Sequence, residues 1–167
     1  MPDKSNLPLP LEVLNQGMID MMVGTQFGTR GWSAGVAAFL KIAVIEINPE
    51  TGVCHCAFKV EDEHLMFTGQ VHGACIASLI DTAMPLLVYP FVPIGSWVAT
   101  TNLNINYLKS VDSGIVDAFS TLETLGSSSA VVTTRVENNG REVALATGQC
   151  MLKRIDGTKL RGDTWGH

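Results

Sequence analysis

One short stretch of the chain combines residue types that could carry acyl chemistry. From Ala74 to Pro90 the sequence is mostly apolar, and Asp81 is its only charged side chain. A carboxylate is rarely left inside a protein core unless it is paired or used in chemistry. Asp81 is therefore a candidate reactive group. The alternative is that its carboxylate only accepts backbone or hydroxyl hydrogen bonds.

Gly73 stands where a helix through this stretch should begin. The first N–H groups of a helix have no partner within it and lie at the positive end of the helix dipole. Glycine also lets a carbonyl group approach the backbone closely. The Gly73 amide is therefore expected to act as a hydrogen-bond donor to an oxyanion.

The stretch that carries these two residues is predicted to be one helix inside the core. Its apolar residues leave no face fully polar, which is typical of a buried helix. Pro85 lies four residues after Asp81 and leaves the Asp81 carbonyl without its helical hydrogen bond, so a kink is expected there. A membrane span requires roughly 20 residues, and we expect this interrupted run to be too short.

The remaining elements follow from apolar spacing and turn residues. An amphipathic helix is predicted from Leu11 to Met22, followed by a glycine-rich loop from Gly24 to Gly35. Two β-branched segments around an Asn-Pro and Gly turn predict a hairpin of Val36 to Ile47 and Val53 to Val60. Four more strands are predicted after the central helix, roughly at Trp97 to Leu108, Gly114 to Thr124, Ser128 to Glu137 and Glu142 to Arg154.

This order of elements contains no alternating strand and helix repeats of the kind that build a parallel sheet. The predicted fold class is α+β, with one antiparallel sheet of about six strands around one long central helix and an extra N-terminal helix. We expect residues 1–35 to form an N-terminal arm, helix and loop. Residues 36–155 should form the single domain, and residues 156–167 a polar tail.

Composition narrows the possible partners. The 167 residues carry 46% hydrophobic side chains and a formal net charge of -5, which suits one domain with its own core. No basic cluster indicates nucleic acid or an anionic membrane. Acidic residues near the N-terminus argue against a transit peptide, so a cytoplasmic location is expected. The four cysteines lack zinc-ligand spacing, and we expect them to be reduced, with no bound metal.

The segment QVHGACIASLIDTA, followed by WVATTNLNINYL, resembles the hotdog-fold acyl-CoA thioesterases of the 4-hydroxybenzoyl-CoA and phenylacetate-pathway type. The resemblance covers about Ala37 to Lys153, and its most specific element is His-Gly with Asp eight residues after the Gly. It implies that the Gly73 amide polarises the thioester carbonyl and that Asp81 is nucleophile or general base. It also implies that Thr100 assists and that His72 orients the turn.

The same resemblance implies substrate-binding positions at Met66, Ser127 and Ser128. Family members often carry Asn where this chain has Met66, and Gly-Arg where it has Gly126-Ser127. A coenzyme A thioester would be the substrate, with no bound cofactor. Sequence alone leaves three functions open: thioester hydrolysis with coenzyme A or a carrier protein, a hotdog dehydration or isomerisation, and non-catalytic acyl binding.

Geometry adds an expectation about assembly. Gly73 and Asp81 are eight residues apart, which separates their backbones by roughly 12 Å along one helix. A homodimer with shared sites would solve this, as the resemblance implies, and a tetramer built as a dimer of dimers is also compatible. Thr100 and Thr101 alternate on the predicted strand, so only one of them can face the site unless the strand contains a bulge.

Overall fold

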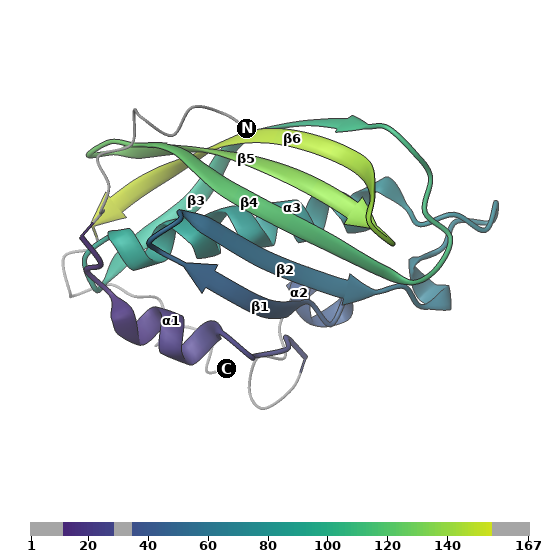
Figure 1. Ribbon diagram of the computed structural model, residues 1–167, viewed down its shortest axis with the longest axis horizontal. Helices are drawn as coiled ribbons and strands as arrows, with labels where there is room; N and C mark the ends of the chain where they lie inside the picture. Colours follow the sequence, from purple (N-terminus) through teal and green to yellow (C-terminus); the bar gives the residue numbers. More distant parts are fainter. Residues whose placement is uncertain (1–11, 29–34, 155–167) are drawn as a thin grey trace, which may run out of the picture.

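The computed structural model describes residues 12–28 and 35–154. The predicted N-terminal arm, part of the glycine-rich loop and the C-terminal tail lie outside the described residues. Six antiparallel strands form one sheet in the order β1-β2-β4-β5-β6-β3, and α3 lies along one face of it (Figure 1). The strands are β1 Ala43–Asn48, β2 Val53–Lys59, β3 Ser96–Tyr107, β4 Ile115–Leu125, β5 Ser129–Asn138 and β6 Arg141–Arg154. The helices are α1 Gln16–Met22, α2 Gly35–Phe39 and α3 Gly73–Val88, with short 3-10 turns η2 Asp62–His64 and η3 Tyr89–Phe91.

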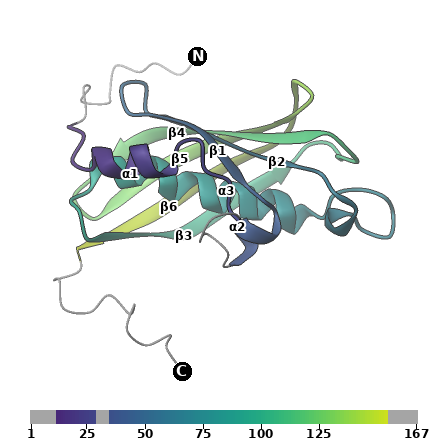
Figure 2. The ribbon, with the colours of Figure 1, turned by 90° about the horizontal axis from the view of Figure 1, so that it is seen from below.

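Helix α3 forms the centre of the hydrophobic core, as predicted. It packs against strands from both halves of the sheet, which curves around it (Figure 2). Its buried residues are Ile76, Leu79, Ile80, Ala83, Met84, Leu86, Leu87 and Val88. The helix therefore supplies the apolar surface on which the sheet folds, and its position fixes the two candidate residues it carries.

The helical stretch continues through the two residues that were expected to interrupt it. Gly73–Phe91 runs on for 19 residues through Asp81 and Pro85, and its length and composition alone would suffice to cross a membrane. However, 61% of its apolar window is buried inside the fold. This packing is that of a core helix wrapped by its own sheet.

One stripe of α3 is not covered within the single chain. Ala74 and Asp81 are exposed, and Ser78 and Pro85 are partly exposed. Residues spaced by three or four positions lie on one face of a helix. The Asp81 carboxylate, expected from sequence to lie inside an apolar helix, is thus on an open face.

The N-terminal helix is shorter than predicted. It begins at Gln16 instead of Leu11, because Asn15 caps it: the Asn15 side chain accepts a hydrogen bond from the Met18 N–H at 3.2 Å. The N–H groups of Leu14 and Asn15 both donate to the Pro90 carbonyl instead of entering a helix. Because Asn15 caps the helix and the preceding amides bond to Pro90, the helix does not extend further toward the N-terminus.

The first predicted strand is also shorter. Gly35–Phe39 is helix α2, and β1 starts only at Ala43. Two consecutive alanines favour a helix over a strand, and Lys41 then turns the chain with a positive φ of 51°. The predicted hairpin of β1 and β2 is confirmed from Ala43 onward by its antiparallel pairing.

Candidate active site

The first turn of α3 is held by its own histidine. His72 is the N-cap residue, and its Nδ1 accepts a hydrogen bond from the Ala74 N–H at 3.1 Å. The His72 N–H donates to the His64 carbonyl at 2.9 Å, and the His72 carbonyl accepts from the Cys75 N–H at 2.9 Å. His72, which was predicted to orient this turn, therefore contacts it directly.

The Gly73 N–H takes part in none of these contacts. Within residues 12–28 and 35–154, no group accepts a hydrogen bond from it. A cavity of about 340 Å³ adjoins Gly73 and is lined in part by Met66, Gln70, Tyr107 and Lys109. An unpaired amide at a helix N-terminus, beside a cavity, is suited to binding an oxyanion.

Tyr107, at the end of β3, lies directly over Gly73. The Tyr107 hydroxyl donates to the Gly73 carbonyl at 3.0 Å. A Cβ atom on Gly73 would lie 3.3 Å from Cζ of the Tyr107 ring. The sequence analysis did not single out Tyr107, because nothing in a chain separation of 34 residues signals this contact.

Asp81 lies in the middle of α3, on the uncovered stripe. The part of the chain that the structure describes offers its carboxylate no hydrogen-bond or ion-pair partner. The neighbouring hydroxyls of Ser78 and Thr82 are bonded instead to the carbonyls of Ala74 and Ser78, at 2.7 and 2.8 Å. The carboxylate is therefore free to act on a bound molecule.

A bulge in β3 decides which threonine faces the helix. In the pairing of β3 with β6, Thr100 lies opposite Cys150 and Asn102 opposite Gln149, so Thr101 is an extra residue. The Thr101 hydroxyl is exposed and donates to the Gln149 carbonyl at 3.1 Å. Thr100 points inward, and its buried Oγ1 has no hydrogen-bond partner.

Thr100 and Asp81 both lie close to the buried Cys150. Burial raises the pKa of the Cys150 thiol, and the nearby charge of Asp81 raises it further. The Thr100 hydroxyl lies beside this thiol without meeting it at hydrogen-bond geometry. A buried hydroxyl without a partner costs stability unless a ligand or a second chain supplies one.

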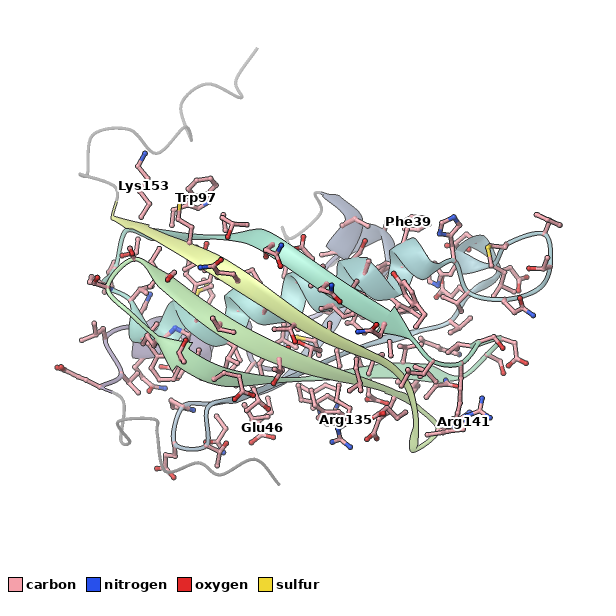
Figure 3. The ribbon with its side chains drawn as sticks, turned by 90° about the horizontal axis from the view of Figure 1, so that it is seen from above. Phe39, Glu46, Trp97, Arg135, Arg141 and Lys153 are labelled. Atoms are coloured by element: carbon pink, nitrogen blue, oxygen red, sulfur yellow. The ribbon has the colours of Figure 1, made fainter. Side chains whose placement is uncertain are left out.

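The remaining predicted residues divide between the two ends of α3. Met66 lines the cavity at the Gly73 end. Ser127 lies at the other end, in a cavity of about 260 Å³ that also contains Phe91 and Lys153, and the Ser128 carbonyl accepts from the Leu152 N–H. Figure 3 shows Lys153 and Trp97 at this far end. One chain therefore does not bring Met66 and Gly73 together with the two serines.

Glu61, Glu63 and His64 are the described residues whose spacing would permit a metal site. The His64 Nδ1 already accepts the Glu61 N–H at 3.0 Å, and Glu61 pairs with Lys41 at 2.6 Å. These contacts engage the His64 Nδ1 and one Glu61 oxygen, and the buried His64 Nε2 has no partner among the described residues. Two of the three groups therefore already have partners of their own.

The chain matches known proteins in both sequence and structure. The thioesterase superfamily model matches residues 68–145, a segment that includes all of α3 and β3. Among solved structures, a phenylacetic acid degradation-related protein from Ralstonia eutropha is 26% identical, with a TM-score of 0.67, and the match covers 75% of this chain and 98% of that one. A search of curated proteins gives no match.

Two further solved structures have the same fold. A thioesterase from Haemophilus influenzae is 19% identical with a TM-score of 0.70, covering 76% of this chain and 89% of that one. A variant of the phenylacetic acid degradation protein PaaI from Thermus thermophilus is 24% identical with a TM-score of 0.61, covering 68% and 94%. The predicted antiparallel sheet around one central helix is confirmed as a hotdog fold.

Proposed function

We propose that this chain hydrolyses an acyl or aryl thioester to the free acid and a thiol, because residues 68–145 match the thioesterase superfamily model and the fold is that of the hotdog thioesterases. The thiol would be coenzyme A or the phosphopantetheine of a carrier protein. The observation that carries the proposal is the unpaired Gly73 N–H at the start of α3, beside the cavity that adjoins it.

In the proposed reaction, the thioester oxygen accepts a hydrogen bond from the Gly73 N–H. Negative charge grows on this oxygen as the carbonyl carbon becomes tetrahedral. A fixed donor with no competing partner stabilises that charge without first having to reorganise. The carbon–sulfur bond then breaks, and the thiolate leaves and takes up a proton.

Asp81 supplies the attack on the carbonyl carbon in one of two ways. As a general base it takes a proton from water, whose oxygen forms the new bond to carbon. As a nucleophile it forms an acyl-aspartate anhydride, which water then cleaves to regenerate the carboxylate. The absence of an ion-pair partner for Asp81 in the described residues supports both routes.

The test is thiol release from a panel of aliphatic and aryl coenzyme A thioesters, followed with a thiol-trapping reagent. Wild-type protein should release thiol from at least one of them, and Asp81→Asn should abolish most of this release. Asp112→Asn is a matched control, because Asp112 is exposed and, among the described residues, accepts a hydrogen bond only from the neighbouring Ser113 hydroxyl. Absence of turnover with every thioester in the panel would reject hydrolysis and leave acyl binding as the alternative.

The proposed site is shared between two copies of the chain. Gly73 and Asp81 lie roughly 12 Å apart along α3, which is too far for both to reach one thioester carbon. Strand β3 is an edge of the sheet, so one side of its backbone is unpaired, and a second copy can add to it. Gly73 of one subunit would then face Asp81 of its partner.

A mixing experiment tests the shared site. Asp81→Asn and Gly73→Pro proteins, each with strongly reduced activity alone, are unfolded together and refolded as mixed dimers. Random association makes half of the dimers mixed, and each mixed dimer holds one site with both groups intact. Activity should therefore return. If heterodimers form and activity stays at the level of the two parents, both groups act within one chain.

A further inference from the structure

Both peptide groups that flank Gly73 are held in place by hydrogen bonds. The peptide between His72 and Gly73 carries the candidate oxyanion donor, and its carbonyl accepts from the Cys75 N–H at 2.9 Å. The next peptide is held at both ends: its carbonyl accepts from the Tyr107 hydroxyl at 3.0 Å, and its N–H donates to His72 Nδ1 at 3.1 Å. Tyr107, Gly73 and His72 thus form one chain of hydrogen bonds.

Such a restraint matters at glycine more than at any other residue. Glycine lacks a Cβ and has the widest range of backbone angles, so an unrestrained Gly73 would let its N–H swing away from a fixed direction. Hydrogen bonds in a series also polarise and strengthen one another. A ring 3.3 Å from the Cβ position of Gly73 limits the motion further.

We propose that Tyr107 is a positioning residue, which aims the Gly73 N–H at the substrate by clamping the peptide that follows Gly73. This inference rests on the proposed function for its kinetic consequence but not for the clamp itself. The Tyr107 side chain is half exposed, and partial burial raises the pKa of its hydroxyl, so it keeps its proton and can donate.

Tyr107→Phe tests the clamp, because it keeps the ring over Gly73 and removes only the hydroxyl. The chain offers a matched control: its other tyrosine, Tyr89, also meets the main chain through its hydroxyl, at Val98, 3.4 to 3.5 Å away. Tyr89 follows the opposite end of α3. Tyr89→Phe therefore repeats the same chemical change away from Gly73.

The first measurement is amide hydrogen exchange in the free protein, which needs no substrate. In Tyr107→Phe, the Ala74 amide should exchange about three- to tenfold faster than in wild type, as expected for losing one neutral hydrogen bond. In Tyr89→Phe it should keep its wild-type rate. Equal Ala74 exchange in wild type and Tyr107→Phe would overturn the clamp, whatever the enzyme activity proves to be.

The second measurement is steady-state kinetics on the best thioester. Tyr107→Phe should lower kcat by about three- to tenfold with KM little changed, because the lost contact acts on the transition state. Adding Tyr107→Phe to Gly73→Pro should lower kcat no further, since that protein has no N–H to aim. A full additional loss in the double variant would show that Tyr107 acts otherwise. If wild type turns over no thioester, the proposed function fails while the exchange result still decides the clamp.

Discussion

The first turn of α3 and its middle differ in how completely their polar groups are paired. At the first turn, His72, Tyr107 and the His64 carbonyl engage the surrounding backbone, while the Gly73 N–H and the buried His64 Nε2 have no partner among the described contacts. In the middle, the Asp81 carboxylate and the Thr100 hydroxyl both lack a partner in the described residues. The first region therefore pairs most of its groups within one chain, whereas the second leaves both of these groups unpaired.

The two regions therefore differ in how far they are ordered before a ligand binds. The first turn is organised before any ligand arrives, as a charge-stabilising donor must be. The middle of the helix has unpaired groups, so hydrogen bonds from substrate, water or a second subunit would stabilise it most. Variants at the first turn should therefore change the rate of thioester hydrolysis. Variants in the middle should also show whether an unpaired group lowers the free energy of unfolding of the free protein.

The largest effect is expected from removing the open donor. Gly73→Pro deletes the N–H at the first helical position, which proline tolerates. Proline and alanine both add a Cβ that would lie 3.3 Å from the Tyr107 ring, so Gly73→Ala is a control for this contact and retains the N–H. We expect kcat of the proline variant to be about 10²- to 10³-fold below that of the alanine variant. Equal kcat values in the two would show that the amide points elsewhere.

Asp81→Asn should give the next largest effect, a fall in kcat of about 10²-fold or more, as is usual for losing a general base or nucleophile. Because Asp81 is exposed and has no partner in the described residues, thermal unfolding should change little. Kinetics and a melting curve on the same preparation check both statements. A loss of less than about tenfold would remove Asp81 from the chemistry.

Thr100→Val should give a smaller loss of rate and no loss of stability. The substitution deletes a buried hydroxyl that has no partner, so the free energy of unfolding should stay the same or rise. If the hydroxyl contacts water or substrate, kcat/KM should fall about five- to tenfold. Thr101→Val is the matched control, because the exposed Thr101 hydroxyl only meets the Gln149 carbonyl. A lower melting temperature for Thr100→Val would mean that the hydroxyl is paired after all.

The sequence predicts the parts of this site that depend on local pattern. The helix start at Gly73 and the burial of most of α3 follow from local pattern alone. The choice between Thr100 and Thr101 was out of reach, because a bulge depends on how β6 pairs with β3. Tyr107 was missed because its contact with Gly73 joins residues that lie 34 positions apart in the chain.

The last prediction concerns the proposed pairing of two copies of the chain, for which the contacts between β3 and α3 predict a register. Tyr107 contacts Gly73, and Tyr89 at the other end of α3 meets Val98, so β3 and α3 run in opposite directions. Thr100 and Asp81 both lie near Cys150. If Gly73 is to face the partner's Asp81, Tyr107 must lie close to Thr100 of the other copy. The twofold axis then passes near the midpoint of these positions, at Leu103 or Asn104.

Cysteine substitution along β3 tests this register. Residues at the axis of an antiparallel pair lie about 4.5 to 5.5 Å from their own copies, within the range of a disulfide, whereas residues two positions away are out of reach. Under mild oxidation, Leu103→Cys or Asn104→Cys should therefore link two chains, and Asn106→Cys should not. The linked protein should keep its rate within about twofold, because these side chains lie outside the proposed chemistry. The native cysteines are mostly buried, so wild type under the same oxidation shows the background. Linking that is strongest at Asn106, or absent along the whole strand, would place Gly73 away from the partner's Asp81 and return the search for a complete site to the single chain.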